Sequence, residues 1–159
     1  MLRTATADDI SAIVDLAVVA GMFSADDASF LHATLRDAVG RREVEQDSSP
    51  GLLVDIDESG AAVGAVFWQP REAADRVWDV TMIVVHAAVR GRGRGAAMMQ
   101  AVEDRLRTNG QRLVIVETSS TAAYARAREF YAHLGYDEEA RVRDYWEDGD
   151  DMIIYRKSL

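Results

Sequence analysis

The segment AAVRGRGRGAAMM, residues 87–99, constrains the fold more than any other part of this chain. In this segment three arginines alternate with three glycines; an apolar run precedes it and strong helix formers follow. A glycine-rich turn between a strand and a helix brings backbone N–H groups to the positive end of the helix dipole, where they bind anions. The segment therefore predicts a strand–loop–helix unit whose loop, Gly91 to Ala96, binds phosphate through its main chain.

Apolar periodicity along the chain predicts the element order β-α-α-β-β-β-α-β-α-β-β, an α/β fold with a mixed, mostly antiparallel sheet. The central unit predicts that Asp79–Val85 pairs in parallel with Leu113–Thr118 through a right-handed crossover. The expected elements, in chain order, are residues 2–6, 6–21, 24–39, 52–57, 61–70, 75–86, the helix after the glycine loop to residue 109, 112–120, 121–135, 136–146 and 152–159.

Local signals define the two N-terminal helices. Thr6 and Asp9 have the spacing of a capping box, in which side chains satisfy the first free N–H groups of a helix. The second helix is expected to bury one side, which carries Phe30, Leu31, Leu35 and Val39. A polar loop over residues 40–51 is expected to follow it.

Composition indicates one domain over residues 1–159 and an ordinary intracellular protein. The chain has no cysteine, which removes disulfides, thiolate metal ligands and a cysteine nucleophile, and no metal site is expected. It lacks a signal peptide and the roughly 20 apolar residues of a membrane helix, so we expect a cytoplasmic protein with no membrane contact. Its net charge of −9 argues against nucleic-acid binding and mildly favours a cationic substrate.

Other classes of glycine-rich loop compete for this segment. A nucleoside-triphosphate loop would continue with Lys and Ser or Thr, which are absent after these glycines. A dinucleotide site is matched in part by Gly91-x-Gly93-x-x-Ala96, with Glu117 near where the ribose would lie. However, the expected strands 52–57, 61–70 and 75–86 form an antiparallel meander before the loop. This meander and the five residues 86–90 before the glycines do not suit a doubly wound domain. A disordered RNA-binding loop would not stand between an apolar strand and an amphipathic helix.

Two motifs resemble those of one enzyme family. VVHAAVRGRGRGAAMMQAVE resembles the acetyl-CoA motif of the GCN5-related N-acetyltransferases (GNAT), Arg/Gln-x-x-Gly-x-Gly/Ala, which Arg90, Gly93 and Gly95 match. YARAREFYAHLGY, residues 124–136, resembles the next motif of this family, a helix that ends in FYxxLGF. The element order of the family is similar to the one predicted here over nearly the whole chain. The resemblance implies that acetyl-CoA is the cosubstrate.

The resemblance also implies how this cosubstrate is bound. In the family, the strand before the loop splays from its neighbour, and its backbone binds the pantetheine arm and polarises the acetyl carbonyl. Tyr124 stands where many members have asparagine, so it either contacts the cofactor or acts as the acid. The residues implied for acetyl-CoA binding are Ile83, Val84, Val85, Arg90, Gly91, Arg92, Gly93, Arg94, Gly95, Ala96 and Tyr124.

Three residues are implied for catalysis of acetyl transfer. Tyr131 corresponds to the family tyrosine that protonates the departing thiolate. The family often places a glutamate base on the third meander strand, where this chain has Asp79. Glu117 is the rival base, because the carboxyl ends of adjacent parallel strands meet at the cofactor cleft.

The acceptor is expected to be an amine, on a small molecule or a peptide, that attacks directly because there is no cysteine to carry the acyl group. The chain is expected to be a monomer or a homodimer. An acetyl-CoA-binding regulatory domain without turnover and an NAD(P)-dependent oxidoreductase are the alternative functions. The residues expected to wall the acceptor side are Phe23, Phe30, His32, Tyr145, Trp146, Glu147, Asp148, Asp150 and Asp151.

Overall fold

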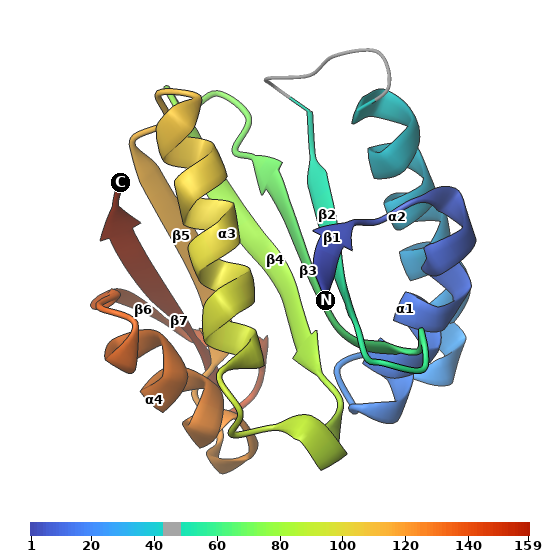
Figure 1. Ribbon diagram of the computed structural model, residues 1–159. Coiled ribbons are helices and arrows are strands. Elements are labelled where there is room, and N and C mark those ends of the chain that lie inside the picture. Colours follow the sequence, from blue (N-terminus) through green and yellow to red (C-terminus); the bar gives the residue numbers. More distant parts are fainter. Residues whose placement is uncertain (43–48) are drawn as a thin grey trace.

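A seven-stranded mixed sheet runs through the molecule in the order β1-β2-β3-β4-β5-β7-β6 (Figure 1). The computed structural model describes residues 1–42 and 49–159, so most of the predicted polar loop lies outside the described residues. The strands are β1 Leu2–Thr4, β2 Gly51–Ile56, β3 Ala62–Pro70, β4 Val77–Val85, β5 Leu113–Ser119, β6 Asp137–Glu147 and β7 Asp150–Ser158. The α-helices are α1 Ile10–Val19, α2 Ala28–Arg42, α3 Arg94–Thr108 and α4 Ala125–His133.

The succession of elements confirms the predicted order and fold class. Among the described strands, β4 and β5 run parallel, and the other neighbouring pairs are antiparallel. A doubly wound dinucleotide-binding domain needs a largely parallel sheet with helices on both faces of successive βα units. The topology therefore contradicts the dinucleotide-binding alternative.

Two hydrophobic cores lie on opposite faces of the sheet. Helices α1 and α2 pack on one face, against β2, β3 and the end of β4, whereas α3 and α4 pack on the other (Figure 1). The first pair of helices covers only the β1–β4 half, and none of the described helices lies over β5, β7 or β6 on that face (Figure 1). In the part of the chain that the structure describes, no helix is long and apolar enough to cross a bilayer.

Capping boxes begin both N-terminal helical segments. The N–H of Thr6 donates to Asp9 Oδ2 over 2.8 Å, which confirms the predicted spacing. Asp9 also accepts a two-pronged bond from Arg3, with N–O distances of 2.8 and 2.7 Å. This guanidinium lowers the pKa of Asp9 to about 2. Ser24 and Asp27 form the second box, in which the Asp27 N–H donates to Ser24 Oγ over 3.2 Å.

The buried side of α2 differs from the prediction at Phe30. Leu31 and Leu35 are buried as expected, and Ala38 continues the same stripe. Phe30 is 73% exposed, so its placement on the buried side was wrong. Successive side chains of an α-helix point about 100° apart, and the buried stripe of α2 is only one residue wide. Phe30, one position before Leu31, therefore lies outside this stripe.

Strand β4 changes the core that it faces at Thr81. Trp68 of β3 lies opposite Val80, but Phe67 lies opposite Met82, so Thr81 is an extra residue in β4. Side chains alternate between faces along a strand, and one extra residue reverses the alternation. Val80 accordingly packs in the core under α3, whereas Met82 packs in the core under α1 and α2.

The parallel pair β4–β5 separates next to this bulge. Val77–Asp79 pairs with Leu113–Ile115, and no pair of described residues continues the ladder beyond them. The prediction that Asp79–Val85 pairs with Leu113–Thr118 was therefore wrong in extent, although the splay of the central parallel pair is confirmed. The extra residue at Thr81 increases twist and bends the strand, which directs it away from β5.

Candidate active site

The glycine loop leads from β4 into α3 through two left-handed residues. Gly91 has φ 75° and Gly93 has φ 76°, conformations that cost a residue with a side chain about 1–2 kcal/mol. The first backbone bond of α3 runs from the N–H of Ala97 to the carbonyl of Gly93 over 2.9 Å. The N–H groups of residues 93–96 therefore have no intrahelical acceptor, as at any helix start. They belong to the loop, Gly91 to Ala96, that the sequence predicts to bind phosphate.

Gly95 has a different role from the other two glycines of the loop. A Cβ on Gly95 would lie 3.3 Å from ring atoms of Phe130 in α4 and 3.8 Å from Val85. The missing side chain therefore lets α4 approach the first turn of α3 closely. This contact fixes the helix that carries Tyr131 against the helix that carries the N–H groups.

The three arginines of the loop have three different environments. Arg90 donates from Nε to the carbonyl of Val85 over 2.9 Å, which attaches the loop to the end of β4. Arg92 is exposed to solvent. Arg94 donates from Nη1 to Asp55 over 2.6 Å, and this carboxylate side chain is only 8% exposed. Arg94 therefore has a buried protein partner, whereas Arg92 is free to meet a phosphate beside a hollow of about 260 Å³.

Ile83 and Val85 direct backbone groups into the opening between β4 and β5. The N–H of His86 donates to the carbonyl of Val63 in β3 over 2.8 Å. Backbone groups of successive strand residues point to opposite sides, so Val84 also faces β3. The N–H and C=O of Ile83 and Val85 consequently face the side from which β5 has withdrawn. Val84, predicted with them, contributes a buried side chain and has its backbone groups on the β3 side.

Tyr131 lies in α4 with its ring in the second core, and the whole side chain is nearly buried. Its ring centroid is 5.4 to 6.0 Å from those of Phe130, Tyr136 and Tyr155. Within the described residues the hydroxyl makes no hydrogen bond, yet no fully buried side-chain N or O there lacks a partner, so this oxygen reaches solvent. Burial raises the pKa of Tyr131 far above its usual value of 10, which keeps the phenol protonated at neutral pH.

Tyr124 lies at the start of α4, one residue before the helix, and is 36% exposed. The loop before it is fixed by Arg128, whose Nη1 donates to the carbonyls of Ser119 and Thr121 over 2.7 and 2.8 Å. The hydroxyl of Ser119 in turn donates to Asp150 Oδ1 over 2.6 Å. Asp150, expected on the acceptor wall, is 9% exposed and instead connects the end of β5 to the β6–β7 hairpin.

The two candidate bases lie together, on either side of an arginine that sequence analysis missed. Nη1 of Arg71 donates to Asp79 Oδ1 over 3.0 Å and to Glu117 Oε1 over 2.9 Å. Burial raises the pKa of Asp79, while the Arg71 guanidinium opposes this rise. Arg71 directly follows β3, and the register that places Gln69 opposite Asp79 is the signal that would have found it. The chain thus brings both predicted carboxylates to the point where β4 and β5 separate.

Only some of the residues expected to wall the acceptor side are exposed and available to contact an acceptor. Tyr145 and Trp146 form an edge-to-face pair with centroids 4.7 Å apart, and they are 52% and 49% exposed on β6 near the hairpin. Asp151 accepts from Arg141 over 2.9 Å, so its carboxylate is already paired. Phe23 packs against the first core.

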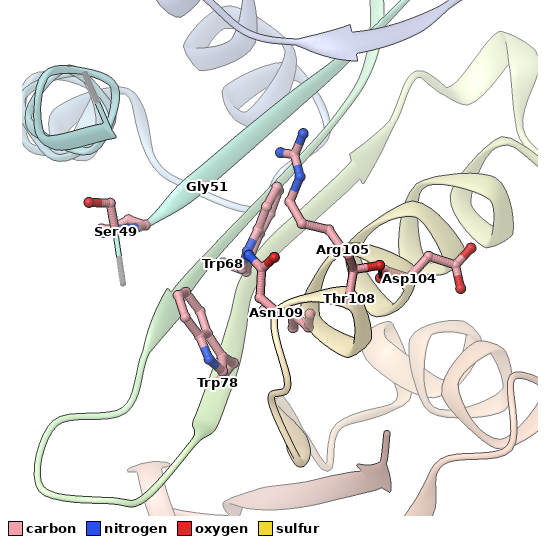
Figure 2. A pocket seen from close by; sticks show the side chains of 10 residues that line it. Ser49, Gly51, Trp68, Trp78, Asp104, Arg105, Thr108 and Asn109 are labelled. Atoms are coloured by element: carbon pink, nitrogen blue, oxygen red, sulfur yellow. Dashed lines mark hydrogen bonds between the residues drawn. The ribbon is translucent and has the colours of Figure 1, made fainter. Parts of the chain in front are cut away.

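A cavity of about 520 Å³ lies at the other end of α3 (Figure 2). Figure 2 shows Trp68 beneath the side chain of Arg105, whose guanidinium carbon is 5.8 Å from the ring centroid. Trp78 also lines it and donates from Nε1 to Gln111 over 2.8 Å. None of the residues predicted for cofactor binding or catalysis lines this cavity. Cavity size therefore does not identify the site here; the opening of the sheet does.

Comparison with known families agrees with this geometry. The model of the acetyltransferase (GNAT) family matches residues 19–136, most of the chain. The chain belongs to the acetyltransferase (GNAT) family. No curated protein sequence matches it.

Solved structures share the fold over their full length. A protein from Desulfovibrio desulfuricans assigned to the GNAT family is 24% identical with a TM-score of 0.85, over 99% of this chain and 98% of that one. An aminoglycoside 6'-N-acetyltransferase complexed with coenzyme A is 13% identical with a TM-score of 0.77, over 99% and 96%. PaiA N-acetyltransferase from Thermoplasma acidophilum, in complex with coenzyme A, is 15% identical with a TM-score of 0.77, over 100% and 98%. At these identities the likeness establishes the fold.

Proposed function

We propose that this chain is an acetyl-CoA-dependent N-acetyltransferase that transfers the acetyl group to a primary amine by direct attack in a ternary complex. The observation that carries the proposal is the opening between β4 and β5. It has free N–H groups of α3 at one end and two carboxylates, Asp79 and Glu117, at the other. Two structural neighbours of this fold were solved with coenzyme A, which supports the choice of cosubstrate.

The opening has the length and the donors that an extended thioester arm needs. Six residues, Val80–Val85, extend about 20 Å at roughly 3.3 Å per residue. The N–H and C=O of Ile83 and the N–H of Val85 face this space and are suited to hydrogen-bond the amides of a pantetheine arm, whereas the carbonyl of Val85 already accepts from Arg90. The helix dipole and the N–H groups at the start of α3 are suited to the pyrophosphate.

The two carboxylates would act on the acceptor amine. An alkyl ammonium with a pKa of about 10.4 is deprotonated in only about one molecule in a few thousand at pH 7, so a base is needed. Asp79 or Glu117 accepts the proton, the amine nitrogen bonds to the acetyl carbon, and the C–S bond breaks. The burial that raises the pKa of Asp79 makes it a stronger base than an exposed aspartate.

Tyr131 would act on the leaving group. Its phenol remains protonated at neutral pH, and its hydroxyl is free of protein partners within the described residues, so it can donate to the departing thiolate. A thiolate with a pKa of about 8.5 leaves fairly well unaided, so the contribution is expected at the lower end of general acid catalysis, roughly a hundredfold.

Calorimetry with acetyl-CoA, followed by a free-thiol assay over a panel of amines, tests this function. Tyr131→Phe is expected to lower kcat about a hundredfold and to leave the Kd for acetyl-CoA unchanged. Tyr155→Phe is the matched control, because this tyrosine belongs to the same cluster but bonds to Glu138 over 3.2 Å. Absence of acetyl-CoA binding at millimolar concentration would refute the proposal.

One observation favours a second candidate, a regulatory domain that binds acetyl-CoA without turnover. Both candidate bases are already paired with Arg71, and an ion-paired carboxylate is a poorer proton acceptor. Binding of acetyl-CoA with no thiol release for any amine would select this alternative.

A further inference from the structure

The guanidinium of Arg71 uses only one of its three nitrogens in the contacts described above. Nη1 donates both of its hydrogens, one to Asp79 and one to Glu117. A guanidinium has five N–H donors, so one on Nε and two on Nη2 remain. No described residue accepts from them, and the side chain is 43% exposed. The Nε–Nη2 edge is therefore an intact two-pronged donor that faces solvent.

The carboxylates beside this edge also keep free oxygens. Asp79 Oδ2 and Glu117 Oε2 have no hydrogen-bond partner among the described residues, and these side chains are 18% and 28% exposed. Two negative charges against one positive charge leave the cluster with a net charge of −1. The free carboxylate oxygens of the cluster can therefore bind one further cation, and the Nε–Nη2 edge of the arginine can bind one further carboxylate.

The position of the cluster relates it to the acceptor. It lies where β4 and β5 separate, directly after the last pair, Asp79 with Ile115. Val80 and Val116 belong to the core under α3, so the alternating side chains of Asp79 and Glu117 are on the opposite face. On the β5 side that face is covered by no helix of residues 1–42 or 49–159 (Figure 1). An acceptor can approach the open end of the proposed thioester channel from there.

We propose that the acceptor is an amine that carries a carboxylate close to its nitrogen, as an α-amino acid does. Its carboxylate binds the Nε–Nη2 edge of Arg71 in a two-pronged contact, and its ammonium binds the free oxygens of Asp79 and Glu117. The planar fork of arginine matches a carboxylate in this way, whereas a lysine ammonium does not. This inference rests on the proposed acetyl transfer.

The experiment compares each of the twenty proteinogenic α-amino acids with its carboxamide in the free-thiol assay. The two compounds share the amine and the side chain and differ in the carboxylate. At least one amino acid is expected to exceed its amide by roughly ten- to a hundredfold in kcat/KM, the range for one charge-assisted contact. Arg71→Lys keeps the charge but removes the fork, and it is expected to bring this ratio close to one.

Arg156→Lys is the matched control. Arg156 lies on the same face, opposite Ile115 in β7, and donates to Ser158 Oγ over 2.8 Å. It is expected to leave the ratio of acid to amide unchanged. Equal turnover of acids and amides by the unaltered protein, or an unchanged ratio in Arg71→Lys, would overturn the inference.

The outcomes separate this inference from the proposed function. If alkylamines, polyamines or lysine peptides release thiol and no amino acid does, acetyl transfer stands and the carboxylate-bearing acceptor is wrong. If acetyl-CoA binds but no amine at all is turned over, both the amino-acid acceptor and the transferase activity are wrong. Calorimetry with acetyl-CoA on Arg71→Lys is expected to give an unchanged Kd, which shows that the variant is folded.

Discussion

Replacement of Glu103 by alanine is expected to destabilise the protein by several kcal/mol, because it disrupts a buried polar network on α3. The side chain is 2% exposed, and its carboxylate has three donors. Oε1 accepts from the hydroxyl of Tyr136 over 3.0 Å, and Oε2 accepts from Lys157 Nζ over 2.8 Å and from Arg107 Nη2 over 3.1 Å. Lys157 also donates to the carbonyl of Leu134 over 2.8 Å. This one carboxylate therefore joins α3 to β7 and to the end of α4.

The size of the effect follows from what Glu103→Ala leaves behind. Tyr136 is 4% exposed, and a buried hydroxyl without a partner costs about 1–3 kcal/mol. Removal of one partner of a buried ion pair costs about 3–5 kcal/mol, but Lys157 and Arg107 are partly exposed at 23% and 39%, which screens the charge. The expected total is about 3–4 kcal/mol. With an m-value of about 2 kcal/mol/M, the urea midpoint falls by about 1.5–2 M.

Urea denaturation at neutral pH measures this loss, with Asp104→Ala as the control. Asp104 is the next residue on α3 and also pairs with Arg107, over 2.9 Å, but it is 61% exposed. Its removal is expected to cost less than about 0.5 kcal/mol. A loss below about 1 kcal/mol for Glu103→Ala, or equal losses for the two variants, would show that the buried network contributes no more than a surface pair.

Two further predictions concern the N-terminal cap and the glycine loop. Asp9→Asn should cost about 1–2 kcal/mol at pH 7. Because Arg3 lowers the pKa of Asp9 from 3.8 to about 2, this stability is present above pH 4 and is lost as the pH falls through 2. Urea denaturation should therefore separate Asp9→Asn from the unaltered protein at pH 7 but not below pH 2. Gly93→Ala should cost about 1–2 kcal/mol because φ of Gly93 is 76°, while no atom within 4 Å would clash with the new Cβ. Gly93→Asn should recover part of this loss, because asparagine tolerates the left-handed conformation better than alanine. A higher melting temperature for Gly93→Ala than for Gly93→Asn would contradict the conformational cause.

The parts of the fold that the sequence predicted are those that local signals determine. On α3, apolar residues recur at the helical spacing, and Val102 and Leu106 of this pattern are buried. The capping spacing of Thr6 with Asp9 is a signal of the same kind. Each depends on residues a few positions apart, so one sequence is enough to detect it. The element order follows from the sum of such signals.

The parts that escaped prediction join residues far apart in the chain. Arg71 contacts Glu117 across 46 positions, and Arg94 contacts Asp55 across 39. A hydropathy pattern contains no strand register, so it does not show that the side chain of Arg71, directly after β3, reaches across β4 to Glu117 in β5. The bulge at Thr81 was hidden for the same reason, because the run VTMIVV is apolar in either register.

The bulge at Thr81 also determines how substitutions in β4 have to be chosen. Before it, even-numbered residues such as Val80 contribute to the core under α3, and after it even-numbered residues such as Val84 contribute to the core under α1 and α2. A deletion of Thr81 would restore regular alternation and leave Met82 through Val85 facing their present layers, but it would remove the bulge that bends β4 away from β5. The number of residues in β4, more than their hydrophobicity, is therefore what a redesign of this opening must preserve.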